Sequence, residues 1–247
     1  MKNLRLILAY EGSSYWGWQD AKERPSIEAV LRKPLVQILQ HPIKLQAASR
    51  TDAGVHAENQ VVNFFTAKEP LNLSRLHLSL NQMLPADIRV WSLEEAPLDF
   101  HPTLAAQKKT YIYRLTTAAI QLPFDRHFAW HVPAPLNFAA IQEALPLFLG
   151  KHHFGALCNA STVPLTNPYC TLYRLDVIHE SAENVRIEVE GDRFLYKMVR
   201  TLVGTLIALG LGRLSLSAIR ALFIHRNRAQ AGMTAPAHGL CLKKVHY

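Results

Sequence analysis

The order of hydrophobic patterns along the chain restricts its fold more than any other feature. Alternating or short apolar runs predict strands, and apolar side chains at every third or fourth position predict helices. In chain order these segments are 2–11 (strand), 26–39 (helix), 43–47 (strand), 60–66 (strand), 73–83 (helix) and 87–93 (strand). Ser26 is typical of a helix N-cap, and Pro34 is expected to kink or split the helix that follows it. This order predicts a ferredoxin-like half for residues 1–100.

The second part of the chain repeats the order. Its segments are 110–116 (strand), 137–149 (helix, imperfect at Pro146), 169–179 and 185–190 (a hairpin), 195–209 and 215–224 (helices), and 238–247 (strand). Residues 101–247 therefore predict a second ferredoxin-like half. The expected fold is α+β, with two βαββαβ halves sharing a mainly antiparallel sheet, helices on one side and an active-site cleft between the halves.

The length, hydrophobic content and cysteine count of the chain indicate its cellular location. With 247 residues and 49% hydrophobic content the chain can bury a real core. No apolar stretch approaches the ~20 residues that cross a bilayer, and the N-terminus is typical of a strand rather than a signal peptide. The three cysteines, Cys158, Cys170 and Cys241, cannot form an even set of disulfides. We therefore expect a cytoplasmic protein without a membrane partner.

The basic charge is confined to the second half. Residues 1–100 hold 11 Lys and Arg against 11 Asp and Glu, whereas residues 101–247 hold 16 against 8, so the net charge of +8 lies there. Such a half favours a polyanionic partner, of which nucleic acid is the obvious one. The alternative is a basic surface that is simply solvated.

A charged loop lies between two predicted strands. The run ASRTDAGVHA, residues 48–57, places Arg50, Asp52 and Gly54 where a fold needs only a connection. Asp-Ala-Gly is by itself a common turn. A carboxylate close to an arginine is also kept ionised, however, which suits a nucleophile or a base. Asp52 is therefore the first catalytic candidate, and Arg50 either pairs with it or reaches a phosphate.

Two further segments carry candidates. Tyr111 and Tyr113 share one face of a strand after a basic pair, so they are core aromatics or, for one of them, a platform for a base. Arg200 follows apolar neighbours closely enough to be partly buried, and a buried arginine needs an anion such as Asp52. The histidines and cysteines lack zinc-site spacing, and no phosphate-binding loop motif occurs. We therefore expect neither a metal nor a cofactor.

These segments together resemble the TruA family of tRNA pseudouridine synthases. ASRTDAGVHA is similar to the catalytic-loop signature of that family. The likeness extends along the chain through AYEGSSYWGWQ (9–19), SIEAVL (26–31), LNQMLPADIRV (80–90), DFHPTLAAQKKTYIYRL (99–115), FLYKMVRTLVGTL (194–206) and APAHGLCLKKVHY (235–247). The order and spacing of these segments agree with the family throughout.

The resemblance implies an isomerase that converts uridine to pseudouridine at tRNA positions 38, 39 and 40, in the anticodon stem-loop, as a homodimer without a cofactor. It implies that Asp52 is the catalytic aspartate and that Tyr111 stacks on the target base. It further implies that Arg200 pairs with the catalytic carboxylate, that Arg50 helps to displace the target nucleotide, and that Leu240 lines the pocket. It implies, finally, that the substrate is tRNA and not DNA.

Three positions depart from the family pattern, which has glycine where this chain has Ser49 and Asn59, and asparagine where it has Thr201. None of them removes an acid, a base or an aromatic that the chemistry needs, but they leave the exact range of modified sites open. The other readings are a non-catalytic RNA-binding protein on the same scaffold, a synthase of the same family that acts on other RNA sites, and a metal-dependent hydrolase.

Overall fold

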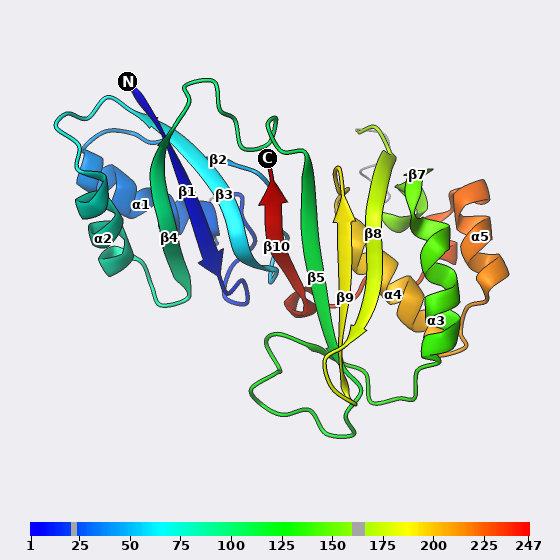
Figure 1. Ribbon diagram of the computed structural model, residues 1–247. Coiled ribbons are helices and arrows are strands. Elements are labelled where there is room, and N and C mark those ends of the chain that lie inside the picture. Colours follow the sequence, from blue (N-terminus) through cyan, green and yellow to red (C-terminus); the bar gives the residue numbers. More distant parts are fainter. Residues whose placement is uncertain (21–23, 160–165) are drawn as a thin grey trace. The chain divides into compact units, whose positions relative to one another are not determined.

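The computed structural model describes residues 1–20, 24–159 and 166–247. Residues 21–23, which precede the predicted helix 26–39, lie outside the described part. The chain clusters into two compact units (Figure 1). Unit 1 consists of residues 1–107 together with 241–247, and unit 2 consists of residues 108–240.

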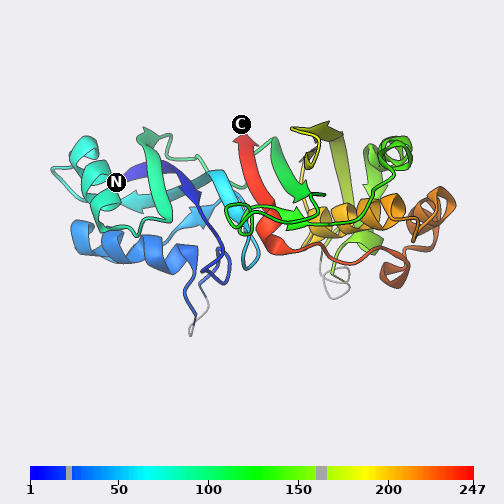
Figure 2. The ribbon, with the colours of Figure 1, turned by 90° about the horizontal axis from the view of Figure 1, so that it is seen from below.

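Unit 1 is an α+β body built on a mixed sheet. Its elements are β1 (Lys2–Tyr10), α1 (Ile27–Leu39), β2 (Gln46–Ala47), β3 (His56–Thr66), α2 (Leu73–Met83), β4 (Ile88–Ala96) and β10 (Leu240–His246). The strand order is β4-β1-β3-β10, with β2 also paired to β3. The β1 strand is antiparallel to β3 and β4, whereas β10 runs parallel to β3. Figure 2 shows α1 along one face of this sheet.

Unit 2 is a second α+β body. Its strands are β5 (Lys108–Thr116), β6 (Trp130–His131), β7 (Gly150–His153), β8 (Tyr169–His179) and β9 (Asn184–Gly191). Its helices are α3 (Phe138–Ala144), α4 (Met198–Gly210) and α5 (Leu216–His225), with short 3-10 turns at Leu145–Phe148, Phe154–Leu157, Arg228–Gln230 and Ala237–Gly239. The order β5-β9-β8-β7 is antiparallel throughout, and β6 adds to β5 in parallel.

The two cores follow from the patterns that predicted the elements. Leu4, Leu6 and Leu8 of β1 are fully buried, as alternation requires of the inward face of a strand. In α4, eleven of the thirteen residues are buried, so this helix is apolar nearly all round and forms the centre of unit 2. The α+β class predicted from the sequence is confirmed.

The start of α1 agrees with prediction, whereas its course at Pro34 does not show the expected split. Ser26 caps α1, because its side chain accepts a hydrogen bond from Ala29 N. Pro34 does not split this helix, which continues unbroken to Leu39. Proline removes one backbone donor, but Leu31 and Leu35 on either side of it are fully buried, and their packing holds the turn.

Other boundaries differ from prediction. The strand expected at 43–47 shortens to Gln46–Ala47, whereas β3 begins at His56 instead of residue 60. The helix expected to reach residue 149 ends at Ala144 and tightens into a 3-10 turn, because Pro146 has no amide hydrogen for the α-helical ladder. The strands β6 and β7 were not predicted, since two to four residues show no periodicity. In the described part of the chain, no helix combines the length and apolarity that a membrane span needs.

Candidate functional site

The loop that carries Asp52 lies in unit 1, between β2 and β3. At its start, Ala48 N donates to Val61 O at 2.8 Å, which ties the loop to β3. At its end, Val55 N donates to Asp52 O at 3.1 Å and closes a turn in which Gly54 has a φ of +78°. The Asp-Ala-Gly stretch is therefore the turn that its composition predicts, and Asp52 occupies its first position.

Buried polar side chains fix the loop from beneath. The amide of Gln60, which is fully buried, accepts a hydrogen bond from Ser49 N at 3.2 Å and donates one to Ser49 O at 2.6 Å. The hydroxyl of Tyr10 lies 2.8 Å from Thr51 Oγ1 and also accepts from Gln60 Nε2 at 3.3 Å. A buried network whose members are hydrogen-bonded rigidifies the backbone it holds. The residues flanking Asp52 are thus anchored to strands β1 and β3.

A second segment, residues 12–18, touches the loop backbone directly. Trp18 N donates to Thr51 O at 3.0 Å. Gly17 has a φ of +89°, and a Cβ placed on it would lie 2.5 Å from Thr51 O and 3.0 Å from Asp52 C. This approach requires glycine for two reasons, the left-handed backbone and the lack of space for a side chain.

The two predicted side chains of the loop differ in exposure. Asp52 is half-buried, whereas Arg50 is exposed. Arg50 lies at a hollow of about 310 Å³ in unit 1, which Lys44 and His101 also line. The loop therefore offers a carboxylate on a restrained backbone close to an exposed cation, a combination that suits chemistry on an anionic ligand.

Tyr111 belongs to unit 2, on β5. Its ring meets that of Phe194 edge to face, with centroids 5.1 Å apart and planes at 82°. Only 6% of Tyr111 is exposed, and Tyr113 on the same face is fully buried. Tyr113 also donates its hydroxyl to Pro236 O at 2.8 Å, which identifies it as a core aromatic.

Arg200 and Leu240 also belong to unit 2. Arg200 lies in the first turn of α4 and is half-buried, as its apolar neighbours predicted. Its Nε donates to Ala235 O at 2.8 Å, and its carbonyl accepts from Ala235 N at 3.0 Å. Leu240, the first residue of β10, is 6% exposed. The structure therefore places Arg50 and Asp52 on one loop of unit 1, whereas Tyr111 and Arg200 lie on elements of unit 2 and Leu240 is the last residue of that unit, where β10 begins.

Sequence reasoning missed the residues that support the loop. Gln60 was recognised only as a member of a strand. Tyr10 and Gly17 were recognised only as members of the segment 9–19 that resembles the family. The cluster of glycine and aromatic residues in YWGW, 15–18, was the signal that could have pointed to a close backbone approach.

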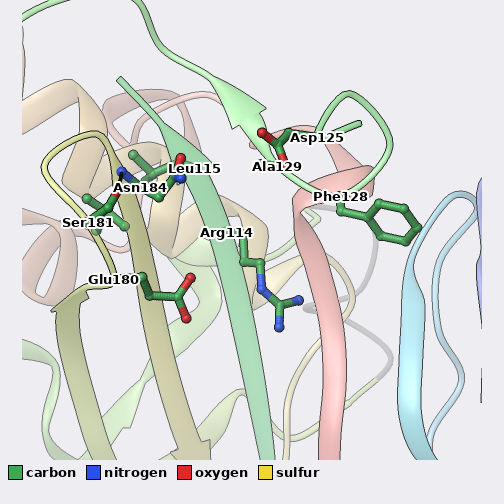
Figure 3. Close-up of a pocket in the computed structure, with 9 residues that line it drawn as sticks. Arg114, Leu115, Asp125, Phe128, Ala129, Glu180, Ser181 and Asn184 are labelled. Carbon is green, nitrogen blue, oxygen red and sulfur yellow. Dashed lines mark hydrogen bonds between the residues drawn. The ribbon is translucent and has the colours of Figure 1, made fainter. Parts of the chain in front are cut away.

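A further hollow lies in unit 2, away from the residues predicted from sequence. It measures about 260 Å³, and Figure 3 shows its lining, which includes Arg114, Asp125, Phe128 and Glu180. None of Tyr111, Arg200 and Leu240 lines it. Over residues 1–20, 24–159 and 166–247, no three His, Cys, Asp or Glu side chains gather as metal ligands would.

Comparison with known proteins places these features in one family. The family model described as tRNA pseudouridine synthase matches residues 6–103 and 144–247. The chain is similar to "tRNA pseudouridine synthase A 2" of Protochlamydia amoebophila (strain UWE25), with 44% identity over 100% of this chain and 95% of the relative. It is 39% identical to tRNA pseudouridine synthase A of Methylacidiphilum infernorum (isolate V4), over 98% of this chain and 94% of the relative. It is 36% identical to that of Thermoanaerobacter sp. (strain X514) over the full length of both chains. The chain therefore belongs to the tRNA pseudouridine synthase family and is an isomerase of that class.

Proposed function

We propose that this protein converts uridine to pseudouridine at positions 38, 39 and/or 40 in the anticodon stem-loop of tRNA, with Asp52 as the catalyst and without a cofactor. The observation that carries the proposal is the loop 48–57, in which a half-buried Asp52 is held by a turn and by a buried polar network. The names of the relatives, which are tRNA pseudouridine synthases A, support tRNA as the substrate.

The reaction makes modest demands on the protein. The N1–C1′ bond of uridine breaks, the uracil turns, a C5–C1′ bond forms, and the proton on C5 is finally replaced by one on N1. Atoms and electrons balance without an oxidant or a second substrate. A carboxylate at Asp52 can add to the base, add to C1′, or remove the proton on C2′. A rigid loop serves each route, because it fixes the distance from the carboxylate to the sugar.

The other four residues prepare the nucleotide. A uridine in a stem must first be extruded, at a cost of a few kcal/mol, and we assign Arg50 to displacing it. Stacking on Tyr111 returns about 1–3 kcal/mol of this cost. Arg200 keeps the Asp52 carboxylate ionised, since an opposite charge favours the charged form. Leu240 forms part of the apolar lining around the base.

The remaining assignments concern architecture and partners. The element order β1-α1-β2-β3-α2-β4 supports a ferredoxin-like half over 1–100. The order β5-α3-β8-β9-α4-β10, to which β6, β7 and α5 are added, supports a second one over 101–247. We propose that the basic half tracks tRNA phosphates and that the working form is a cytoplasmic homodimer, as in the family that the sequence resembles. A monomer mass in light scattering across working concentrations would rule out the dimer, and recovery with membranes after cell fractionation would contradict the location.

The main competing function is RNA binding without catalysis on the same scaffold. Pseudouridine mapping on an unmodified tRNA transcript with uridines at positions 38–40 separates the two. We expect modification at one or more of these positions, and none in a transcript in which they are cytidines. Tight binding without modification would favour the binding protein, and modification elsewhere would favour a synthase with another site range.

Tyr111 provides a separate test of base stacking. We expect Tyr111→Phe to retain affinity for tRNA, because a phenyl ring stacks as well, and Tyr111→Ala to lower kcat/KM by about 10–100-fold, the equivalent of losing one base–aromatic stack. Because little of Tyr111 is exposed, a covering side chain has to move when the base arrives. Single-turnover rates on the same transcript measure the effect, and an unchanged rate with Tyr111→Ala would remove stacking from the mechanism.

A further inference from the structure

Two half-buried cations lie close together in unit 2, beside Tyr111. Lys109 precedes Tyr111 by two residues on β5, so both side chains leave the same face of the strand. Lys109 is paired in register with Gly191, the last residue of β9, and Arg193 follows two residues later. Both cations are partly covered. Among the residues that the structure describes, neither side chain has an acidic group within ion-pair distance.

The acidic residues at the end of β9 nearest to Lys109 and Arg193, Glu190 and Asp192, form hydrogen bonds with other groups. Glu190 holds Lys108 Nζ at 2.8 Å and Thr110 Oγ1 at 3.1 Å, on the opposite face of β5 from Lys109. Asp192 Oδ1 accepts from the backbone amides of Thr171 at 2.8 Å and Arg193 at 2.7 Å. Both carboxylates are therefore engaged by other groups, and the positive charge of Arg193 still acts on Lys109.

The local packing keeps the two cations beside an aromatic pair. A Cβ on Gly191 would lie 2.8 Å from Leu172 Cδ2 and 3.2 Å from Phe194 Cζ, so the lack of a side chain there lets Phe194 close over β9. Phe194 in turn contacts the ring of Tyr111. The segment that brings Phe194 to Tyr111 also carries Arg193, whose positive charge acts on Lys109.

This arrangement affects the ionisation of Lys109. Burial, and next the positive charge of Arg193, lower the pKa of Lys109 to about 8. Arg193 is the charged group that acts on Lys109 from the segment after β9, while the Lys108–Glu190 pair lies across the strand. Two like charges held together in a partly dry place are unfavourable by themselves, and an anion bound between them removes the repulsion.

We propose that Lys109 and Arg193 together bind one phosphodiester group of the RNA substrate, next to the nucleotide that stacks on Tyr111. The inference rests on the proposed function for the identity of the ligand, while the anion site itself rests on the residues above. A guanidinium and an ammonium on adjacent elements match the oxygens of a phosphate group. An RNA chain supplies such a group on each side of a stacked base.

Salt dependence of binding tests the phosphate contact. We compare the dissociation constants of Lys109→Gln and Arg193→Gln for the tRNA transcript with those of Lys33→Gln and Arg75→Gln, which remove exposed cations on α1 and α2, outside the basic half. Losing one phosphate contact lowers the slope of log K against log salt by up to about one. We expect this change in the first two variants and an unchanged slope in the two controls. Unchanged slopes in Lys109→Gln and Arg193→Gln would overturn the inference.

A second measurement uses pH and separates contact from folding. A bound phosphate raises the pKa of Lys109, so the wild type takes up a proton on binding and its affinity falls as pH rises above about 8. Lys109→Arg keeps its charge over this range. We therefore expect it to bind with an affinity within about threefold of the wild type at pH 7 and to lose the pH dependence. Equal pH dependence in both proteins would place the titrating group elsewhere and contradict the inference.

Two further results would separate the source of the bound phosphate from the proposed pseudouridine synthase activity. Saturation of the site by inorganic phosphate alone at millimolar concentration, seen as a raised Lys109 pKa by NMR without RNA, would assign it to a free anion and overturn the RNA contact. If the wild type formed no pseudouridine but the salt slopes still changed, the contact would stand and the proposed function would fall. If the wild type were active and the slopes unchanged, only the contact would fall.

Discussion

Replacement of Asp52 by asparagine is expected to abolish pseudouridine formation while tRNA binding stays within about tenfold of the wild type, because most contacts that position RNA are made to its backbone. Asparagine has nearly the shape of aspartate, so the turn at residues 52–55 and the network beneath it should persist. It cannot act as a nucleophile or as a base. The expected loss of turnover is at least about 10²–10⁴-fold, which is the range that one acid–base group contributes.

The measurement is single-turnover pseudouridine formation together with a binding isotherm on the same transcript. Asp99→Asn is the matched control, since it makes the same chemical change at an exposed position of unit 1, and it should behave as the wild type in both assays. Loss of binding in parallel with turnover would mean that Asp52 supports the site rather than the chemistry. Full activity of the variant would exclude Asp52 as the catalyst.

Gly17→Ala is expected to cause the largest loss among substitutions outside the five proposed site residues. Alanine at a φ of +89° is strained, and its Cβ would lie 2.5 Å from Thr51 O. Since that oxygen also accepts from Trp18 N, the loop backbone cannot retreat without breaking a hydrogen bond. We expect a destabilisation of about 2–5 kcal/mol from backbone strain and overpacking combined, and a lower turnover in the molecules that remain folded.

Gly212→Ala distinguishes the two causes. Gly212 also has a positive φ, of +70°, but no heavy atom lies within 4 Å of the Cβ it would carry. The Gly212→Ala variant should therefore be destabilised only by the strain of its left-handed backbone, by about 1–2 kcal/mol, and its turnover should be unchanged. Urea unfolding and single-turnover rates measure both variants. Equal effects of the two substitutions on stability and turnover would mean that the contact with Thr51 does not constrain the loop.

Most helices and strands could be predicted from the sequence, because hydrophobic periodicity and helix-capping residues are local signals. Ser26 marked the start of α1, and the apolar spacing over residues 73–83 marked α2. The predictions that were wrong concern features that depend on packing between distant segments. The burial of Leu31 and Leu35 keeps α1 whole at Pro34, and pairing with β1 and β10 extends β3 back to His56. No local pattern records either effect.

For the candidate site too, local sequence predicted some features, and others depend on contacts between distant segments. The sequence of residues 48–57 pointed to Asp52, and its neighbours predicted a half-buried Arg200. The support from Gln60 depends on which face of β3 lies under the loop, and the pairing of Lys109 with Gly191 depends on strand register. Register is a relation between distant segments, so no local pattern within a single segment contains it.

The parallel pairing of β10 with β3 has a consequence for synthesis. Residues 241 and 242 pair with 56 and 57, directly after the Asp52 loop, and Lys243 O accepts from Asn59 at 2.8 Å. Residues 108–240 must leave the ribosome before this strand is available, so unit 1 stays incomplete while unit 2 is being made. Contacts of such long sequence separation form slowly. The strand edge of β3 beside the Asp52 loop is thus open during translation, until the second unit has been synthesised and β10 can pair with it.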